Sequence, residues 1–203
     1  CPAGGRINAS NPCSEYMFLD DTACNLASLN LMQFRHDDGS FNIPAFEHAC
    51  RLWTLTLEIS VLMAQFPSKE IAQLSYEYRT LGLGFANIGG LLMAEGHSYD
   101  SDEGRAICGS ISAIMTGVAY ATSAEIASEV GAFPNYKKNA KPMLRVMNNH
   151  RLAAHGKSAG YEGLEILPVP LASNSCPDQT LPEAAKAAWD LAVDLGKKYG
   201  YRN

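Results

Sequence analysis

The chain has 203 residues, of which 47% are hydrophobic and 18% are charged. This composition excludes an intrinsically disordered segment, which carries few apolar residues and a high net charge, and it excludes collagen-like and coiled-coil chains. Sixteen basic and 21 acidic residues give a net charge of −5. That balance argues against a broad nucleic-acid-binding face, which must be basic, but it is compatible with a local anion site.

The sequence carries no signal for secretion or for a membrane span. It begins at Cys1 without a basic segment followed by an apolar one, so we expect no signal peptide and a chain cut or processed from something longer. The longest uncharged run, 106–124, contains seven Gly, Ser and Thr residues. It is typical of a buried helix with close small-residue packing rather than of a helix in lipid.

The cysteines and histidines do not have the spacing of a metal site. None of the six cysteines forms a Cys-x-x-Cys pair, and none of the five histidines forms a His-x-x-x-His pair. Six cysteines are also few for a disulfide scaffold. We interpret Cys50 and Cys108 as core residues of apolar helices, and Cys176 as structural.

Loop and strand are predicted for the first forty residues. Residues 8–15 are polar, contain Pro12 and have no periodicity, so they form a loop. The mixed pattern of leucines in 23–34 predicts a short buried strand, and the sequence DDGS at 37–40 predicts a turn.

Helices are predicted from residue 44 onward. Residues 44–66 carry apolar side chains at spacings of three and four, which indicates one apolar stripe. Pro44 stands near the start of this helix, where its missing N–H costs nothing, and Pro67 ends it. Ser68 is placed to cap a short helix that ends at about Tyr78.

A glycine-rich segment follows at 81–85. Its alternation of apolar residues with glycine predicts a short strand with close backbone neighbours. Position 87 is Asn, so the segment does not complete the Gly-x-Gly-x-x-Gly motif of a dinucleotide-binding loop.

The second half of the chain is predicted to be mainly helical. Asp100 is the candidate cap of a long helix that runs to Val130 and stops at Gly131 in the left-handed conformation. Residues 141–154 form another helix, and 156–178, with three prolines, form an extended connector.

The last helix is predicted from its capping signals. Thr180 and Glu183 form a capping box, and the helix runs to Tyr199, with Gly200 after it. Lys197 and Lys198 stand in its final turn, where they complement the helix dipole.

The segment that carries chemistry is Asn11-Pro12-Cys13-Ser14-Glu15, with Cys24 eleven residues after Cys13. In an extended loop, Asn11, Cys13 and Glu15 face one spot and present an amide, a thiol and a carboxylate. A carboxylate beside a reacting group acts as a general base, and a thiol there is a nucleophile or hydrogen-atom donor. The spacing alone favours a plainer interpretation, with Cys13 a small buried apolar residue, Asn11 a turn residue and Glu15 a surface charge.

The residues around this segment resemble a known family. Residues 6–31 (RINASNPCSEYMFLDDTACNLASLNL) resemble the active-site finger loop and following barrel strand of ribonucleotide reductases, most closely the adenosylcobalamin-dependent class II. Four further segments resemble the same family: 78–105, 142–150, 161–169 and 198–203. The resemblance therefore covers nearly the whole chain. The resemblance implies a helix-rich α/β fold, a partial segment of the ten-stranded α/β barrel of that family.

We therefore treat 1–203 as a single segment of the catalytic barrel domain. Within it, 1–40 comprise the finger loop and a strand, and 41–155 comprise a helical layer with a short strand near 81–86. Residues 156–180 are the connector, and 181–200 are the final helix.

The resemblance also implies residue roles. Cys13 matches the cysteine that becomes a thiyl radical and abstracts the 3′ hydrogen of the ribose. Glu15 matches the general base for the 3′ hydroxyl, and Asn11 the amide that orients the ribose. Pro12 and Ser14 complete the substrate-binding loop. Cys24 matches one member of the cysteine pair that supplies two reducing equivalents.

The same resemblance implies a cofactor and partners. The parent would be a cytoplasmic enzyme that uses adenosylcobalamin, a ribonucleotide and a thioredoxin-like dithiol reductant. The remainder of the reductase barrel would complete the site, dNTP effectors would bind outside this segment, and the parent is compatible with a homo-oligomer. No membrane is involved.

Two departures from the family pattern predict that the isolated segment is inactive. The second cysteine of the redox pair belongs upstream, and Cys1 is too close to the finger loop to replace it. The strand and Pro-Thr-Gly-Thr loop that grip the substrate phosphate would follow Asn203. Two alternatives stay open: a catalytically silent helical module that assembles with a partner chain, and a reductase of the same superfamily with a different radical source.

Overall fold

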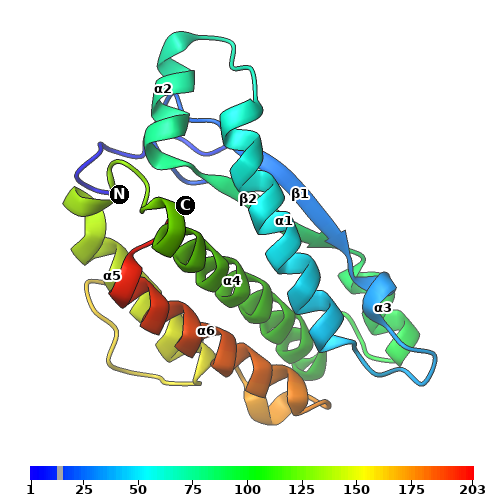
Figure 1. Cartoon of the computed structure of the whole chain (residues 1–203). Helices are drawn as coiled ribbons and strands as arrows, with labels where there is room; N and C mark the ends of the chain where they lie inside the picture. The colour runs from blue at the N-terminus through cyan, green and yellow to red at the C-terminus, as the bar shows by residue number, and fades with distance from the viewer. Residues whose placement is uncertain (13–15) are drawn as a thin grey trace.

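The computed structural model describes residues 1–12 and 16–203, and its elements are mostly helical (Figure 1). Strand β1 leads into a short 3-10 helix, and β2 lies between the second and third α-helices. The three longest helices, α1, α4 and α6, lie side by side. The bounds are β1 Asn25–Asn30, η1 Leu31–Phe34, α1 Ile43–Met63, α2 Lys69–Tyr78, β2 Leu81–Ala86, α3 Ile88–Glu95, α4 Asp102–Val130, α5 Tyr136–Ala154, η2 Ser173–Ser175 and α6 Thr180–Tyr199.

The two strands pair in parallel, with Asn25 opposite Leu81 and Asn30 opposite Ala86. Parallel neighbours need a long crossover, which α1 and α2 provide. Gly82 allows the close approach that the glycine alternation predicts. A Cβ atom on Gly82 would clash with the Leu26 side chain and lie 2.6 Å from the Cys24 sulfur.

Helix α4 is the central helix of the layer that covers the sheet. Figure 1 shows it between α1 and α6. At Gly117 the two helix backbones of α4 and α6 meet, since a Cβ atom there would lie 2.8 Å from the Ala188 Cβ. Helix α4 is long and apolar enough to cross a membrane by length and composition, but 61% of its most apolar stretch is buried inside the protein. The contacts support the predicted buried core helix.

A buried cluster of charges ties the far parts of the chain together. The Glu58 carboxylate, on α1, accepts hydrogen bonds from Arg79 Nε at 2.9 Å and from Arg202 Nε at 2.7 Å. Asn203 Nδ2 donates to Glu58 Oε2 at 2.5 Å and to the carbonyl oxygen of Arg79 at 3.1 Å. Arg79 is fully buried and takes the left-handed conformation, φ 52°, as the C-cap of α2. Charged groups this deep are stable only when they are paired.

Several helix ends confirm the sequence signals. Ser68 Oγ accepts from the Ile71 N–H at 3.3 Å and caps α2 as predicted. Helix α6 ends at Tyr199 with Gly200 at φ 75°, and Gly131 ends α4 at φ 85°, ψ 157°. The conformation of Gly131 is open only to glycine, but it is not the left-handed helical conformation that we expected.

Three predicted boundaries are wrong, and two of them are helix ends. Helix α5 starts at Tyr136 rather than at residue 141, because edge-on ring contacts of Tyr136 with Phe133 and Tyr201 hold an extra turn before Pro142. Helix α1 stops at Met63 rather than at residue 66, since the chain becomes extended at Ala64 as it approaches Pro67.

The strand predicted over 23–34 shortens to β1. The side chain of Asn30 accepts from the Met32 N–H at 3.2 Å and turns the chain into η1. Leu29 is buried, but Leu26 is 65% exposed, because successive side chains of a strand point to opposite faces and the even-numbered residues of β1 lie on the exposed face. The strand is therefore only partly buried.

Two predicted caps are replaced by neighbours. Ser101 Oγ, rather than Asp100, accepts from the Gly104 N–H at 3.0 Å and caps α4. The capping box at Thr180 does not form, because Asp178 Oδ1 already accepts from the Thr180 N–H at 2.9 Å.

We predict that Glu58→Gln destabilises the chain by about 3–5 kcal/mol, because it leaves the buried guanidinium group of Arg79 and the partly buried one of Arg202 without a carboxylate. Thermal or urea unfolding measures the change. The matched control is Glu125→Gln, which removes an exposed ion pair with Arg51 and should cost at most about 1 kcal/mol. Equal effects of the two substitutions would contradict this role of Glu58.

We predict that Gly117→Ala lowers the free energy of unfolding by about 1–3 kcal/mol, because the new methyl group overlaps α6. Alanine otherwise favours a helix over glycine by about 1 kcal/mol, so any loss reports the helix contact. Ser112→Ala, on an exposed position of the same helix, should be neutral or slightly stabilising. A stabilised Gly117→Ala variant would show that α4 and α6 do not pack as described.

Candidate active site

The loop that carries the predicted chemistry is described at both of its flanks. Asn11 and Pro12 precede it and Tyr16 follows it, whereas Cys13, Ser14 and Glu15 lie outside the described residues. Asn11 Oδ1 accepts from the Tyr16 N–H at 2.9 Å, and the Asn11 N–H donates to the Tyr16 carbonyl oxygen at 3.4 Å. These two bonds bring the two flanks together. They hold the Asn11 amide through its oxygen, and no described residue accepts a hydrogen bond from its NH₂ group.

The Tyr16 hydroxyl connects the end of this loop to β2. It lies 2.7 Å from Thr80 Oγ1 and 2.8 Å from Thr22 Oγ1. Thr22 Oγ1 donates in turn to the carbonyl oxygen of Leu19 at 2.5 Å. A chain of donors from Tyr16 to Thr80 to the Ala23 carbonyl oxygen uses one proton on each hydroxyl. Burial raises the pKa of Tyr16, so its hydroxyl keeps the proton that this chain requires.

Cys24 follows directly after a residue that the same network fixes. The carbonyl oxygen of Ala23 accepts from Thr80 Oγ1 at 2.9 Å, and the Ala23 N–H donates to Ser75 Oγ at 2.9 Å. Cys24 itself is half-buried, packs over Gly82 and lines an open groove with Trp53 and other residues of α1. The structure thus brings Asn11, Tyr16 and the backbone before Cys24 into one hydrogen-bonded unit.

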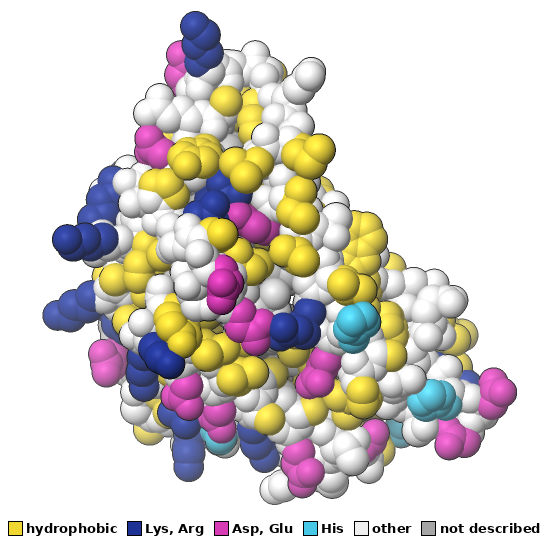
Figure 2. All heavy atoms as spheres, in the orientation of Figure 1, with side chains coloured by type: hydrophobic (Ala, Val, Ile, Leu, Met, Phe, Trp, Pro, Cys, Tyr) yellow, Lys and Arg dark blue, Asp and Glu magenta, His cyan; other side chains and the backbone are white. Residues whose placement is uncertain are grey.

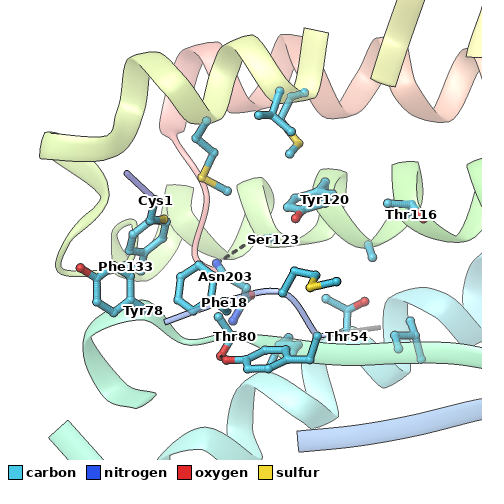
Figure 3. Close-up of a pocket in the computed structure, with 18 of the residues that line it drawn as sticks. Cys1, Phe18, Thr54, Tyr78, Thr80, Thr116, Tyr120, Ser123, Phe133 and Asn203 are labelled. Atoms are coloured by element: carbon cyan, nitrogen blue, oxygen red, sulfur yellow. Dashed lines mark hydrogen bonds between the residues drawn. The ribbon is translucent and has the colours of Figure 1, made fainter. Parts of the chain in front are cut away.

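A cavity of about 530 Å³ lies beside this unit, lined by residues 16–18, the start of β2 and helices α1, α4 and α5. Figure 3 shows Thr116, Tyr120 and Ser123 of α4 across the cavity from Phe18 and Thr80. Most of its wall is apolar or aromatic, and burial raises the pKa of Tyr120. Asn203 closes one side, where its N–H donates to Ser123 Oγ at 2.9 Å.

Sequence reasoning missed this cavity and the role of Tyr16. The wall residues come from elements far apart in the chain, and no motif links them. Tyr16 does stand next to the recognised loop, but its partner Thr80 is 64 residues away.

The remaining described cysteines are placed in the core or at its margin. Cys50 is fully buried, and burial raises the pKa of its thiol to about 12. Cys176 is buried and donates to the Asp178 carbonyl oxygen at 3.2 Å, whereas Cys108 is half-buried. Cys1 lines the cavity beside the loop. In residues 1–12 and 16–203, no three His, Cys, Asp or Glu side chains gather as a metal site would require.

Comparison with known proteins defines the class. A family model described as "Ribonucleotide reductase, barrel domain" matches residues 1–203. The chain belongs to this family, and the fold is a helix-rich part of its α/β barrel. The family predicted from the finger-loop motif is confirmed.

The names of individual relatives are more specific than the family description. The chain is 66% identical to a protein named vitamin B12-dependent ribonucleotide reductase from Bradyrhizobium diazoefficiens, over 100% of this chain and 16% of that protein. It is also 66% identical to a protein of the same name from Agrobacterium fabrum, again over 100% of this chain and 16% of the relative. A third, from Rhodopirellula baltica, is 49% identical over 100% of this chain and 18% of its own length. The chain thus spans less than a fifth of these relatives.

Thiol chemistry tests the placement of the cysteines. Alkylation by iodoacetamide at pH 8 should modify half-buried Cys24 faster than Cys50, because the thiolate is the reactive form and burial disfavours it at Cys50. Mass spectrometry of timed samples gives the rate at each residue, and alkylation in denaturant is the control in which all cysteines react. Equal rates at the two residues in the folded protein would contradict the described core.

Proposed function

We propose that the polypeptide containing this chain reduces ribonucleotides to deoxyribonucleotides, and that this chain supplies the radical-cysteine loop. The observation that carries the proposal is the hydrogen-bonded unit around residues 11–16. It ties the two flanks of the loop together and anchors them one residue before Cys24, in a chain that matches the reductase barrel family throughout.

The proposed reaction starts at Cys13. As a thiyl radical, Cys13 takes the 3′ hydrogen atom of the ribose, which leaves a carbon radical and a Cys13 thiol. Glu15 accepts the proton of the 3′ hydroxyl, and the NH₂ group of Asn11 orients the ribose by a hydrogen bond. The 2′ hydroxyl takes a proton from the cysteine pair that includes Cys24 and leaves as water. Pro12 and Ser14 complete the substrate-binding loop.

Cys24 supplies part of the reducing power in this proposal. With a second cysteine from elsewhere in the barrel it delivers two electrons and two protons, one proton to the departing 2′ hydroxyl and one to the 2′ carbon, and ends as a disulfide. Glu15 returns its proton to the 3′ oxygen. Cys13 then returns a hydrogen atom to the 3′ carbon and becomes a radical again. A thioredoxin-like dithiol exchanges with the disulfide and restores both thiols. The groove beside Cys24 leaves it half-buried, which is compatible with such an exchange.

Adenosylcobalamin is the cofactor that the names of the relatives indicate. When bound, it would supply the first radical. The residues described here do not form a recognisable site for it, because the cavity beside the loop is of ordinary ligand size, about 530 Å³, and is walled mainly by apolar and aromatic side chains. We therefore assign no residue of this chain to the cofactor and derive no step through it.

The remainder of the barrel is the proposed partner of this segment. No described strand pairs with the outer edge of β1, and hydrophobic side chains gather over α1 on the surface (Figure 2). The large exposed side chains of α1 are Leu52, Trp53, Leu55, Ile59, Leu62 and Met63. An open strand edge beside an apolar helix face is what an incomplete barrel presents. In this proposal the parent is cytoplasmic and compatible with a homo-oligomer, and dNTP effectors bind outside this segment.

The central test uses the whole polypeptide, adenosylcobalamin, a ribonucleotide and a dithiol. Cys13→Ser should abolish deoxyribonucleotide formation, because a serine hydroxyl cannot replace the thiyl radical. Cys108→Ser, a half-buried cysteine on α4, is the matched control and should keep activity close to the wild type. Product is measured by chromatography.

The other outcomes separate the alternatives. Activity without cobalamin would keep the reaction but assign it to another radical source. An inactive wild type with cofactor bound would favour the silent helical module, for which ultracentrifugation with neighbouring gene products would reveal a partner.

We also expect no turnover from the isolated 203-residue segment under the same conditions. It lacks the second redox cysteine and the phosphate-binding loop that the family pattern requires. Product from the segment alone, at a rate above that of its Cys13→Ser variant, would contradict this expectation.

A further inference from the structure

Tyr16 is fixed in the protein by two independent contacts. Its ring packs against Phe18, with 6.1 Å between ring centroids, and Phe18 in turn meets Tyr78 edge-on at 5.4 Å. Its hydroxyl lies 2.7 Å from Thr80 Oγ1. The ring contact leads through Phe18 to the end of α2, and the hydroxyl contact reaches Thr80 just after that helix, so the two restrain Tyr16 from two directions.

Thr80, which accepts the hydrogen bond of the Tyr16 hydroxyl, is itself held in place. Thr80 follows Arg79, whose side chain is fully buried against Glu58. Thr80 also donates to the Ala23 carbonyl oxygen at 2.9 Å, one residue before Cys24. The hydroxyl of Thr80, the residue before β2, therefore contacts both Tyr16 and the residue before Cys24.

The main-chain bonds of Tyr16 reach the other side of the loop. Its N–H and carbonyl oxygen pair with Asn11 at 2.9 and 3.4 Å. A displacement of Tyr16 would therefore move both flanks of the segment that contains Cys13, whereas Cys24 would stay attached to β2.

We infer that Tyr16 is a positioning residue whose hydroxyl, through Thr80, sets where the two flanks of the Cys13 segment, Asn11 and Tyr16, lie relative to Cys24. The expected effect of Tyr16 on turnover rests on the proposed function. The position of the loop flanks does not, and it can be tested without turnover. Tyr16 touches no reacting atom in this account, and it acts through Asn11 and the loop.

The test compares Tyr16→Phe, which removes only the hydroxyl, with wild type in the whole polypeptide. A loop displaced by about 1 Å costs on the order of 100-fold in rate, so we expect kcat to fall about 10- to 100-fold with little change in KM. Tyr99→Phe is the matched control, because Tyr99 is 72% exposed and distant from the network in sequence. It should leave kcat unchanged.

Substitutions at Thr80 make the test specific for the hydroxyl contact. Thr80→Val should lower kcat at least as much as Tyr16→Phe, because it also removes the bond to the Ala23 carbonyl oxygen. The double variant should be no worse than Thr80→Val, because the Tyr16–Thr80 contact can be lost only once. Thr80→Ser keeps the hydroxyl and should restore most of the activity. Additive losses, or a Thr80→Ser variant as impaired as Thr80→Val, would overturn the inference even if the fold is intact by thermal unfolding.

A second readout does not depend on turnover. The rate at which iodoacetamide alkylates Cys13 in the folded polypeptide, without substrate, should rise in Tyr16→Phe and in Thr80→Val but not in Tyr99→Phe. If the wild-type polypeptide shows no reductase activity, this readout alone decides the inference, and the failure then belongs to the proposed function. Unchanged Cys13 alkylation together with wild-type kcat in Tyr16→Phe would overturn the inference and leave the proposed function standing.

Discussion

The carboxylate of Glu58 is the point on which the arrangement of this protein depends. It receives the guanidinium groups of Arg79 and Arg202 and the amide of Asn203, so that α1, the end of α2 and the end of the chain meet at one buried charge. Paired charges at such depth contribute little net stability over apolar packing, but an unpaired one is costly. The cluster therefore acts mainly to select one arrangement of these segments.

The position of the candidate active site follows from that selection. Arg79 is held in a left-handed conformation at the end of α2, and the next residue, Thr80, begins the turn into β2. Thr80 contacts both Tyr16 and Ala23. A buried ion pair thus holds Arg79, which places the hydroxyl of the next residue, Thr80. That hydroxyl contacts the two stretches of chain that carry the proposed chemistry. Loops supported in this way by rigid elements are the usual means of placing reactive groups accurately.

Local signals in the sequence predict much of the fold, and non-local contacts account for what they miss. Periodicity, prolines and caps predict α1, α2, α4, α6 and β2 to within a few residues, because these features act over one or two turns. The start of α5 was misplaced because ring contacts with Phe133 and Tyr201 extend the helix beyond what Pro142 suggests. Arg79 gives no sign of complete burial, since its partners lie 21 residues before it and at the far end of the chain. The loop at residues 11–15 was identified by resemblance, whereas its attachment through Tyr16 and Thr80 required the structure.

We propose that the loop between Asn11 and Tyr16 presents Cys13 to the ribose of a nucleotide. An experimental structure of the whole polypeptide with a bound ribonucleotide tests it most directly, through the distance between Cys13 Sγ and the 3′ carbon. We predict that distance to be about 3–3.5 Å, the range of reacting atoms in a productive complex, with the Asn11–Tyr16 and Tyr16–Thr80 bonds intact. A ribose bound elsewhere, or a loop that carries Cys13 away from it while those bonds persist, would contradict the account.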